Sequence, residues 1–257
     1  MTPDLPSNSE NQGKPKRSLK RNNSKNSRNK NSKRPKKTKN ETIQLNDSHG
    51  SDYTKISENI ICFKISSKKK VPSYRCQCGD NGLNCSDESC RNRRAYKECT
   101  EKCRAANCRN RRFSNKEYAK YYVKDVGNKG MGLMTSEIIH KDEFIGEFVG
   151  EIMKYGQFGK RDHQHAFCTQ KYYYEAKNFG NPLRYLNHSC SPNAECQVWH
   201  VPGTPGNIEK LGIFAIKDIA KDEEITIHYG YGQASGEQCY CGADNCEGFI
   251  GGAENGN

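Results

Sequence analysis

Seven cysteines lie within the 33 residues from position 76 to position 108, and this spacing constrains the fold more than any other feature of the chain. Structural zinc sites use four tetrahedral thiolate or imidazole ligands. Seven thiolates therefore complete two sites only if one sulfur bridges both ions, and we take Cys85 as the bridge. Free core cysteines do not cluster with such spacing. The sequence thus predicts one ion held by Cys76, Cys78, Cys85 and Cys90, and another held by Cys85, Cys99, Cys103 and Cys108.

A second cysteine cluster, reading CYCGADNC, lies near the C-terminus and contains Cys239, Cys241 and Cys246. Three ligands leave a tetrahedral site one short, so a fourth thiolate must come from elsewhere in the chain. An open catalytic zinc site is the alternative, but no carboxylate and histidine pair accompanies the motif. Disulfides are a further alternative for secreted chains, yet no secretory signal opens this one, which favours metal ligation.

The basic charge of the chain is concentrated in its N-terminal part. The net charge is +12, and residues 11–40 alone hold thirteen Lys or Arg and no acid, so the remainder is close to neutral. We expect residues 1–65 to form a disordered basic tail, because so few apolar side chains cannot offset the entropy of the chain. Residues 32–39, SKRPKKTK, match a nuclear import signal, and such a run also binds polyanions such as DNA. No apolar stretch approaches the roughly 20 residues that span a bilayer, so we expect no membrane partner.

Between the two clusters, the pattern is that of a mostly β domain made of small sheets. Short β-type runs broken by Gly, Asn and Pro occupy residues 121–126, 132–134, 143–149, 172–175, 211–216 and 224–229. Residues 155–162 are compatible with one short helix. Periodicity alone names no function.

Four motifs in this region carry more information together than any one does alone. They are Lys129-Gly130-Met131-Gly132-Leu133, then Gly146-Glu147-Phe148-Val149-Gly150-Glu151, then Asn187-His188-Ser189-Cys190 after Arg184, and finally Glu224-Ile225-Thr226-Ile227-His228-Tyr229. In this order they resemble the signatures of the SET-domain methyltransferases. The seven-cysteine block resembles the AWS module that precedes such domains, and CYCGADNC resembles the post-SET zinc site. The combination is similar to the NSD and Ash-type group, whose members methylate histone H3 at lysine-36.

The resemblance implies a fold and a domain organisation. It implies a SET fold of small β-sheets with a threaded pseudoknot loop, flanked by zinc-bound AWS and post-SET modules. We expect the AWS module over residues 70–117, the SET domain over 118–231 and the post-SET module over 235–252. The implied activity is transfer of methyl groups from S-adenosylmethionine to a lysine of histone H3 in the nucleosome, with three zinc ions, in the nucleus and on the chromosome.

The resemblance also assigns roles to individual residues. Gly130 and Gly132 let the backbone approach the cofactor, although a plain β-turn is the alternative, and Lys129 and Met131 flank it. Asn187 binds the amino group of the cofactor, His188 engages the adenine, and Tyr240 closes over the adenine edge. Cys190 supplies the missing fourth ligand to the C-terminal zinc. Tyr229 is the catalytic residue, acting by orientation and electrostatics because a neutral phenol is a weak base.

The chain departs from the family pattern near the substrate channel. Residues 166–168, Ala-Phe-Cys, stand where relatives have a tyrosine that lines the lysine channel, so Phe167, which we place among the cofactor-binding residues, lacks that hydroxyl. The run at 172–174 is an alternative source of the ring. Two other functions therefore remain open: a chromatin-binding SET module with weak turnover, and a zinc-dependent nucleic-acid binder that uses the basic tail.

Overall fold

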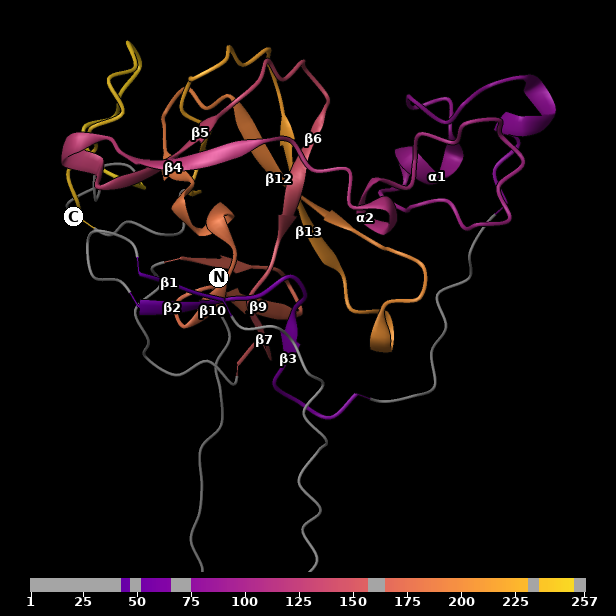
Figure 1. Cartoon of the computed structure of the whole chain (residues 1–257), viewed down its shortest axis with the longest axis horizontal. Helices are drawn as coiled ribbons and strands as arrows, with labels where there is room; N and C mark the ends of the chain where they lie inside the picture. Colours follow the sequence, from indigo (N-terminus) through magenta and orange to yellow (C-terminus); the bar gives the residue numbers. More distant parts are fainter. Residues whose placement is uncertain (1–42, 47–51, 66–74, 157–164, 231–235, 252–257) are drawn as a thin grey trace, which may run out of the picture. The chain divides into compact units, whose positions relative to one another are not determined.

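The computed structural model describes residues 43–46, 52–65, 75–156, 165–230 and 236–251, and most of its regular structure is short β-strands (Figure 1). The strands in chain order are β1 (Ile43–Asn46), β2 (Asp52–Lys55), β3 (Ile60–Ile61), β4 (Tyr121–Asp125), β5 (Met131–Thr135), β6 (Phe144–Phe148), β7 (Glu151–Lys154), β8 (Ala166–Cys168), β9 (Tyr172–Glu175), β10 (Phe179–Gly180), β11 (Asn187–His188), β12 (Ala194–Trp199), β13 (Lys210–Ala215) and β14 (Thr226–Ile227). The described helices are about one turn long: α1 (Arg91–Arg94), α2 (Arg112–Asn115) and the 3-10 turns η1 (Cys78–Asn81), η2 (Gly127–Lys129), η3 (Pro182–Tyr185) and η4 (Pro205–Asn207).

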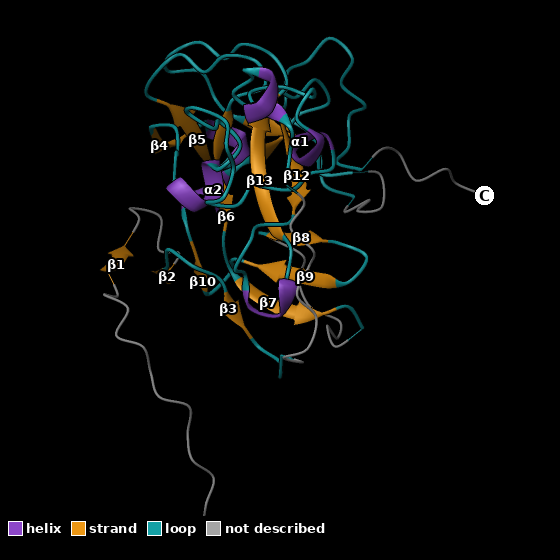
Figure 2. Ribbon diagram, turned by 90° about the vertical axis from the view of Figure 1, so that its right-hand side faces the viewer, coloured by secondary structure: helices purple, strands orange, loops and turns teal. Residues whose placement is uncertain are grey.

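These strands form five small sheets rather than one large one. The largest has the order β3-β7-β9-β8, and a second has β13 between β12 and β6 with both pairings antiparallel. β1, β2 and β10 form a third, β4 pairs with β5, and β11 pairs with β14. Figure 2 shows β13 and β12 above the sheet of β7, β8 and β9. The predicted mostly β architecture is confirmed, and each of the six β-type runs expected from the sequence contains a strand.

The two-stranded β11–β14 sheet positions Asn187, His188 and Tyr229, which the sequence predicted as site residues. Its strands are parallel, with Asn187 opposite Thr226 and His188 opposite Ile227. The amide of Asn193 reinforces this pairing, since its Nδ2 donates to the carbonyl of Glu224 at 2.8 Å and its Oδ1 accepts from the Thr226 N–H at 2.8 Å. The segment that contains Asn187 is therefore fixed beside the strand that leads to Tyr229.

The expectation of a disordered tail through residue 65 is wrong for its last part. β2 pairs in parallel with β10, and β3 pairs in parallel with β7. Tyr53 is only 6% exposed, and its ring lies 4.5 Å from the guanidinium carbon of Arg184. Composition alone misses this segment because its strands, two to four residues long, gain stability from tertiary contacts rather than from their own pattern. Residues 1–42, including the expected import signal at 32–39, lie outside the described residues, as does most of the expected helix at 155–162.

The cysteine-rich segment packs against the β12–β13–β6 sheet through a cluster of aromatic rings. Phe113 of α2 lies 4.5 Å from Phe144 and 5.9 Å from Trp199, measured between ring centroids. Gly212 allows this contact, because a Cβ there would lie 2.5 Å from Cζ of Phe113. The buried carboxylate of Glu98 accepts hydrogen bonds from the Phe113 N–H at 2.6 Å and the Ser114 N–H at 3.2 Å, which satisfies the first donors of α2. The cysteine-rich segment, through α2, and the sheet thus share one apolar junction.

Replacing Tyr53 with alanine is expected to destabilise the protein by about 3 kcal/mol, since a large buried ring is lost. Urea denaturation measures the change in the free energy of unfolding. Tyr155→Ala is the control, because Tyr155 is 65% exposed and its loss is expected to change stability by less than about 0.5 kcal/mol. Equal stability of the two variants would contradict the packing of residues 52–65.

Within the described ranges, no helix combines the length and the apolar character that crossing a bilayer requires.

Candidate functional site

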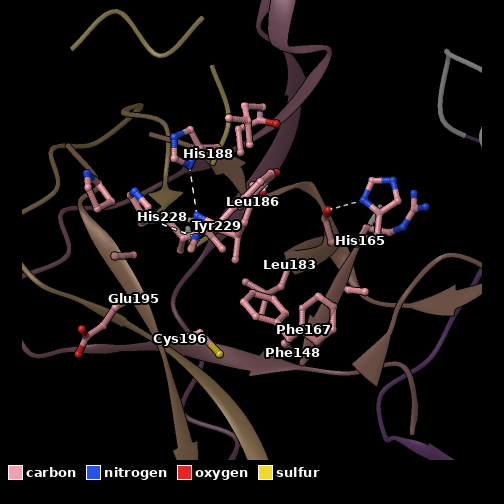
Figure 3. Close-up of a pocket in the computed structure, with 18 of the residues that line it drawn as sticks. Phe148, His165, Phe167, Leu183, Leu186, His188, Glu195, Cys196, His228 and Tyr229 are labelled. Atoms are coloured by element: carbon pink, nitrogen blue, oxygen red, sulfur yellow. Dashed lines mark hydrogen bonds between the residues drawn. The ribbon is translucent and has the colours of Figure 1, made fainter. Parts of the chain in front are cut away.

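One cavity of about 1060 Å³ gathers most of the residues singled out in the sequence (Figure 3). The loop before β5, strand β8, the turn from η3 into β11, the start of β12 and the C-terminal segment all contribute to its wall. The predicted catalytic and cofactor-binding residues that line it are Lys129, Phe167, Asn187, His188, Tyr229 and Tyr240, and the predicted zinc ligand Cys239 lines it too. Gly130, Met131 and Gly132 are not among the described lining residues, and they lie directly after Lys129 in the chain.

The loop around η2 owes its shape to glycine. Gly130 has φ 72° and ψ −138°, a backbone conformation open essentially only to glycine. At Gly132, a Cβ would lie 2.7 Å from Oε1 of Glu224 and 2.8 Å from Cγ2 of Val126. This glycine makes room for the Glu224 carboxylate, which forms an ion pair with Lys129.

Asn187 stands at the cavity wall with its amide nitrogen turned into the protein. Nδ2 donates to the carbonyl of Met131 at 3.2 Å and to Oε1 of Glu224 at 2.8 Å. These contacts join β11, β5 and the segment before β14.

His188 is 5% exposed and is held as a neutral imidazole. Burial lowers the pKa of His188, and the nearby ring of His228 acts in the same direction. Its Nδ1 accepts the backbone N–H of Tyr229 at 3.2 Å, which leaves the ring proton on Nε2. Nε2 lies 3.4 Å from Sγ of Cys190, so the ring links the site to the thiol group described below.

Tyr229 follows β14 and lines the cavity close to His188, with ring centroids 5.4 Å apart. Its hydroxyl donates to the carbonyl of Leu186 at 2.8 Å. Burial of the phenol raises the pKa of Tyr229, and the charges of Glu237 and Glu224 raise it further. The hydroxyl is therefore neutral at physiological pH, and with its proton directed to Leu186 its oxygen can accept from a group inside the cavity.

An aromatic wall lies deeper in the cavity. Phe167 of β8 meets Phe148 of β6 edge to face, at 4.7 Å between centroids, beside Leu183 and Leu186 (Figure 3). The alternative source of a phenol ring fails. None of Tyr172, Tyr173 and Tyr174 is among the described lining residues; Tyr174 is fully buried and donates to the carbonyl of Glu209.

The C-terminal thiols come together with Cys190 as expected. The sulfurs of Cys190, Cys239, Cys241 and Cys246 all lie within 4.8 Å of one another, and the Cys190 and Cys239 sulfurs are 3.9 Å apart. Zn–S bonds of about 2.3 Å at tetrahedral angles place sulfurs roughly 3.8 Å apart, so this group fits zinc. The side chain of Asn245 donates to the carbonyl of Cys190 at 3.1 Å, which adds a second link between the two segments.

The N-terminal thiols form one continuous cluster with separations of 3.5 to 3.8 Å between neighbouring sulfurs. Cys85 and Cys99 both belong to the two tetrads that lie within 4.8 Å, so each has the position that a bridging thiolate needs. The grouping differs from the expected one at a single member, since Cys99 replaces Cys78 in the first tetrad. The Cys99 sulfur lies 3.8 Å from those of both Cys76 and Cys90, so proximity alone does not divide the cluster as predicted. The tetrads are Cys76, Cys85, Cys90 and Cys99, and Cys85, Cys99, Cys103 and Cys108.

Some residues at the site received no role from the sequence. Glu224 was visible only as the first residue of a motif, and its contacts with Lys129 and Asn187 depend on the tertiary fold. His165 lines the cavity, and its Nδ1 lies 2.8 Å from the carbonyl oxygen of Arg184. No local pattern marks a histidine of this kind, because its partner lies in a different element.

The comparisons with known proteins agree with this geometry. Residues 130–230 match the family model of the SET domain. A protein of Aspergillus oryzae named histone-lysine N-methyltransferase, H3 lysine-36 specific, is 37% identical over 213 residues, covering 77% of this chain and 21% of that protein. Histone-lysine N-methyltransferase ASHH2 of Arabidopsis thaliana is 34% identical over 195 residues, covering 69% of this chain and 11% of that protein. The chain thus spans about a fifth or less of the length of these curated relatives.

Proposed function

Residues 130–230 of this chain belong to the SET domain family, and on that premise we propose that the protein transfers methyl groups from S-adenosylmethionine to a lysine of histone H3. The observation that carries the proposal is the convergence of Asn187, His188 and Tyr229 on one cavity from β11 and the end of β14. When bound, the cofactor supplies a methyl group activated on a sulfonium. The chain must then orient a neutral amine in line with that methyl and keep water away.

The lining residues suit these tasks. The Oδ1 of Asn187 is an acceptor for the cofactor's ammonium, and the neutral imidazole of His188 lies beside the expected adenine position. The hydroxyl oxygen of Tyr229 is placed to orient the substrate amine. Phe148, Phe167 and Leu186 form an apolar channel wall, which favours the uncharged form of a lysine amine by desolvation.

We further propose that the three thiol groups hold zinc in closed, structural sites. The sulfur separations fit thiolate-bound zinc, and all ligands are supplied by the protein. The N-terminal cluster holds two ions with Cys85 bridging, and the C-terminal group holds the third. The third site fixes Cys190 to the segment that carries Tyr240, and so closes one end of the cavity.

The substrate position and the location are inferred from the relatives. Both named relatives are histone-lysine methyltransferases, and one is named as specific for lysine-36 of histone H3. A nucleosome substrate, a nuclear location and DNA contact by the basic tail are consistent with the sequence of residues 11–40.

A second candidate is a chromatin-binding SET module with weak turnover. It is favoured by Phe167, because the phenol that lines this channel in relatives is replaced by a ring without a hydroxyl, and residues 172–174 do not supply one.

Radiolabelled methyl transfer onto recombinant nucleosomes tests the proposal. We expect incorporation into histone H3 on wild-type nucleosomes, and none when arginine replaces lysine-36 of that histone. Label at another lysine of histone H3 would support the proposed methyl transfer but would contradict lysine-36 as the target. Cofactor binding without any label would favour the second candidate.

A further inference from the structure

The side chains of Lys129, Asn187 and Glu224 form a polar network at the cavity wall, which Lys129 and Asn187 line. Oε1 of Glu224 accepts a hydrogen bond from Nδ2 of Asn187 at 2.8 Å. Its Oε2 forms an ion pair with the ammonium of Lys129. The Lys129 and Glu224 side chains are only 20% and 14% exposed, so water screens the pair weakly.

The network determines which end of the Asn187 amide faces the cavity. Both groups that contact Nδ2, the Met131 carbonyl and the Glu224 carboxylate, can only accept hydrogen bonds. Turning the amide over would place Oδ1 against two other oxygens. Oδ1 therefore points away from them, and no described residue donates to it.

The main chain around Glu224 is fixed on both sides of the residue. Its backbone carbonyl accepts Nδ2 of Asn193 at 2.8 Å, and the next residue donates its N–H to the carbonyl of Leu133 at 2.7 Å. The missing side chain of Gly132 leaves the space that Oε1 occupies. The main chain thus fixes where the Glu224 side chain begins, and the weakly exposed ion pair with Lys129 holds its carboxylate.

We infer that Glu224 is a positioning residue for the cofactor: with Lys129 on its other oxygen, it holds the Asn187 amide so that Oδ1 accepts from the α-ammonium of S-adenosylmethionine. This inference rests on the proposed function. It also explains why glycine stands at position 132, where no contact with the cavity requires it.

Binding of two ligands separates this role from a general structural one. The probes are S-adenosylhomocysteine and the analogue in which hydrogen replaces its amino group, both measured by titration calorimetry on the full chain. For the wild type we expect the analogue to bind about 10- to 100-fold more weakly, the range for a hydrogen bond to a charged group. In Glu224→Ala this ratio is expected to fall to about threefold or less, because the amide is no longer held. A merely structural loss would weaken both ligands equally and leave the ratio unchanged.

Further variants keep the test decisive if Glu224→Ala does not fold. Gly132→Ala displaces the carboxylate and Lys129→Met removes its ion-pair partner, so both are expected to lower the ratio, and Lys129→Arg is expected to retain it. Asp222→Asn is the matched control: it removes a neighbouring charge that contacts only Tyr122 among the described side chains, and asparagine tolerates its φ of 64°.

The outcomes distinguish this inference from the proposed function. If the ratio of the two affinities is unchanged in Glu224→Ala, or in both Gly132→Ala and Lys129→Met, Glu224 is not a positioning residue. Cofactor binding itself would not be contradicted by that result. Equal affinities of the wild type for the two ligands would have the same consequence. A wild type that binds neither ligand would overturn both proposals.

Discussion

Tyr229→Phe is expected to slow methyl transfer by about 100- to 1000-fold, the range observed when one preorganised polar group is removed from an active site. The hydroxyl donates to the Leu186 carbonyl at 2.8 Å, which fixes the direction of its lone pairs toward the cavity. The raised pKa of Tyr229 keeps the phenol neutral, so it acts through orientation rather than by removing a proton. Single-turnover methyl transfer to nucleosomes measures the change in rate.

Cofactor binding separates this effect from a folding defect. The phenylalanine ring keeps the contact with His188, and the hydrogen bond to Nδ1 of His188 comes from the backbone N–H, so affinity for S-adenosylhomocysteine should persist. Tyr122→Phe is the matched control, because it removes a hydroxyl that contacts Asp222 outside the cavity. Methyl transfer at the wild-type rate in Tyr229→Phe would show that the Tyr229 hydroxyl has no catalytic role.

The local motifs predicted the site better than the scaffold around it. Asn187, His188 and Cys190 are almost adjacent in the chain, and Tyr229 ends the β-type run at 224–229, so the sequence alone could point to them. The pairing of β11 with β14 that brings them together is two residues long and leaves no periodic signal.

Residues whose importance comes from distant contacts were missed or misjudged. Tyr53 lies after a basic, polar segment, and its burial, the pairing of β2 with β10 and the contact with Arg184 show that the fold includes it. Gly132 suggested close approach to a cofactor, yet the atom it accommodates belongs to Glu224, more than 90 residues later. Such close approaches depend on the tertiary fold, which composition and spacing do not encode locally.

The position of Cys190 would connect the proposed C-terminal zinc site to the proposed cofactor site. This residue is three positions beyond Asn187, its sulfur joins those of Cys239, Cys241 and Cys246, and its carbonyl accepts from Asn245. The described C-terminal segment, which carries Tyr240 on the cavity wall, has only short β pairing of its own, the bridge between Gln238 and Phe249. A small segment of this kind depends on metal for its order.

Cys190→Ser is therefore expected to reduce bound zinc from three ions per chain to two. It is also expected to weaken S-adenosylhomocysteine binding by about 10- to 100-fold, because Tyr240 would no longer be held against the ligand, and one apolar side chain packed against a ligand contributes about that much. Zinc content by mass spectrometry and affinity by calorimetry should change together, because the same thiolate closes the site and positions Tyr240. Cys62→Ser is the control: that thiol is exposed and belongs to none of the three groups, so both quantities should stay at wild-type values. Loss of one zinc with unaltered affinity would show that the C-terminal segment does not close the cavity, and retention of all three ions would exclude Cys190 as a ligand.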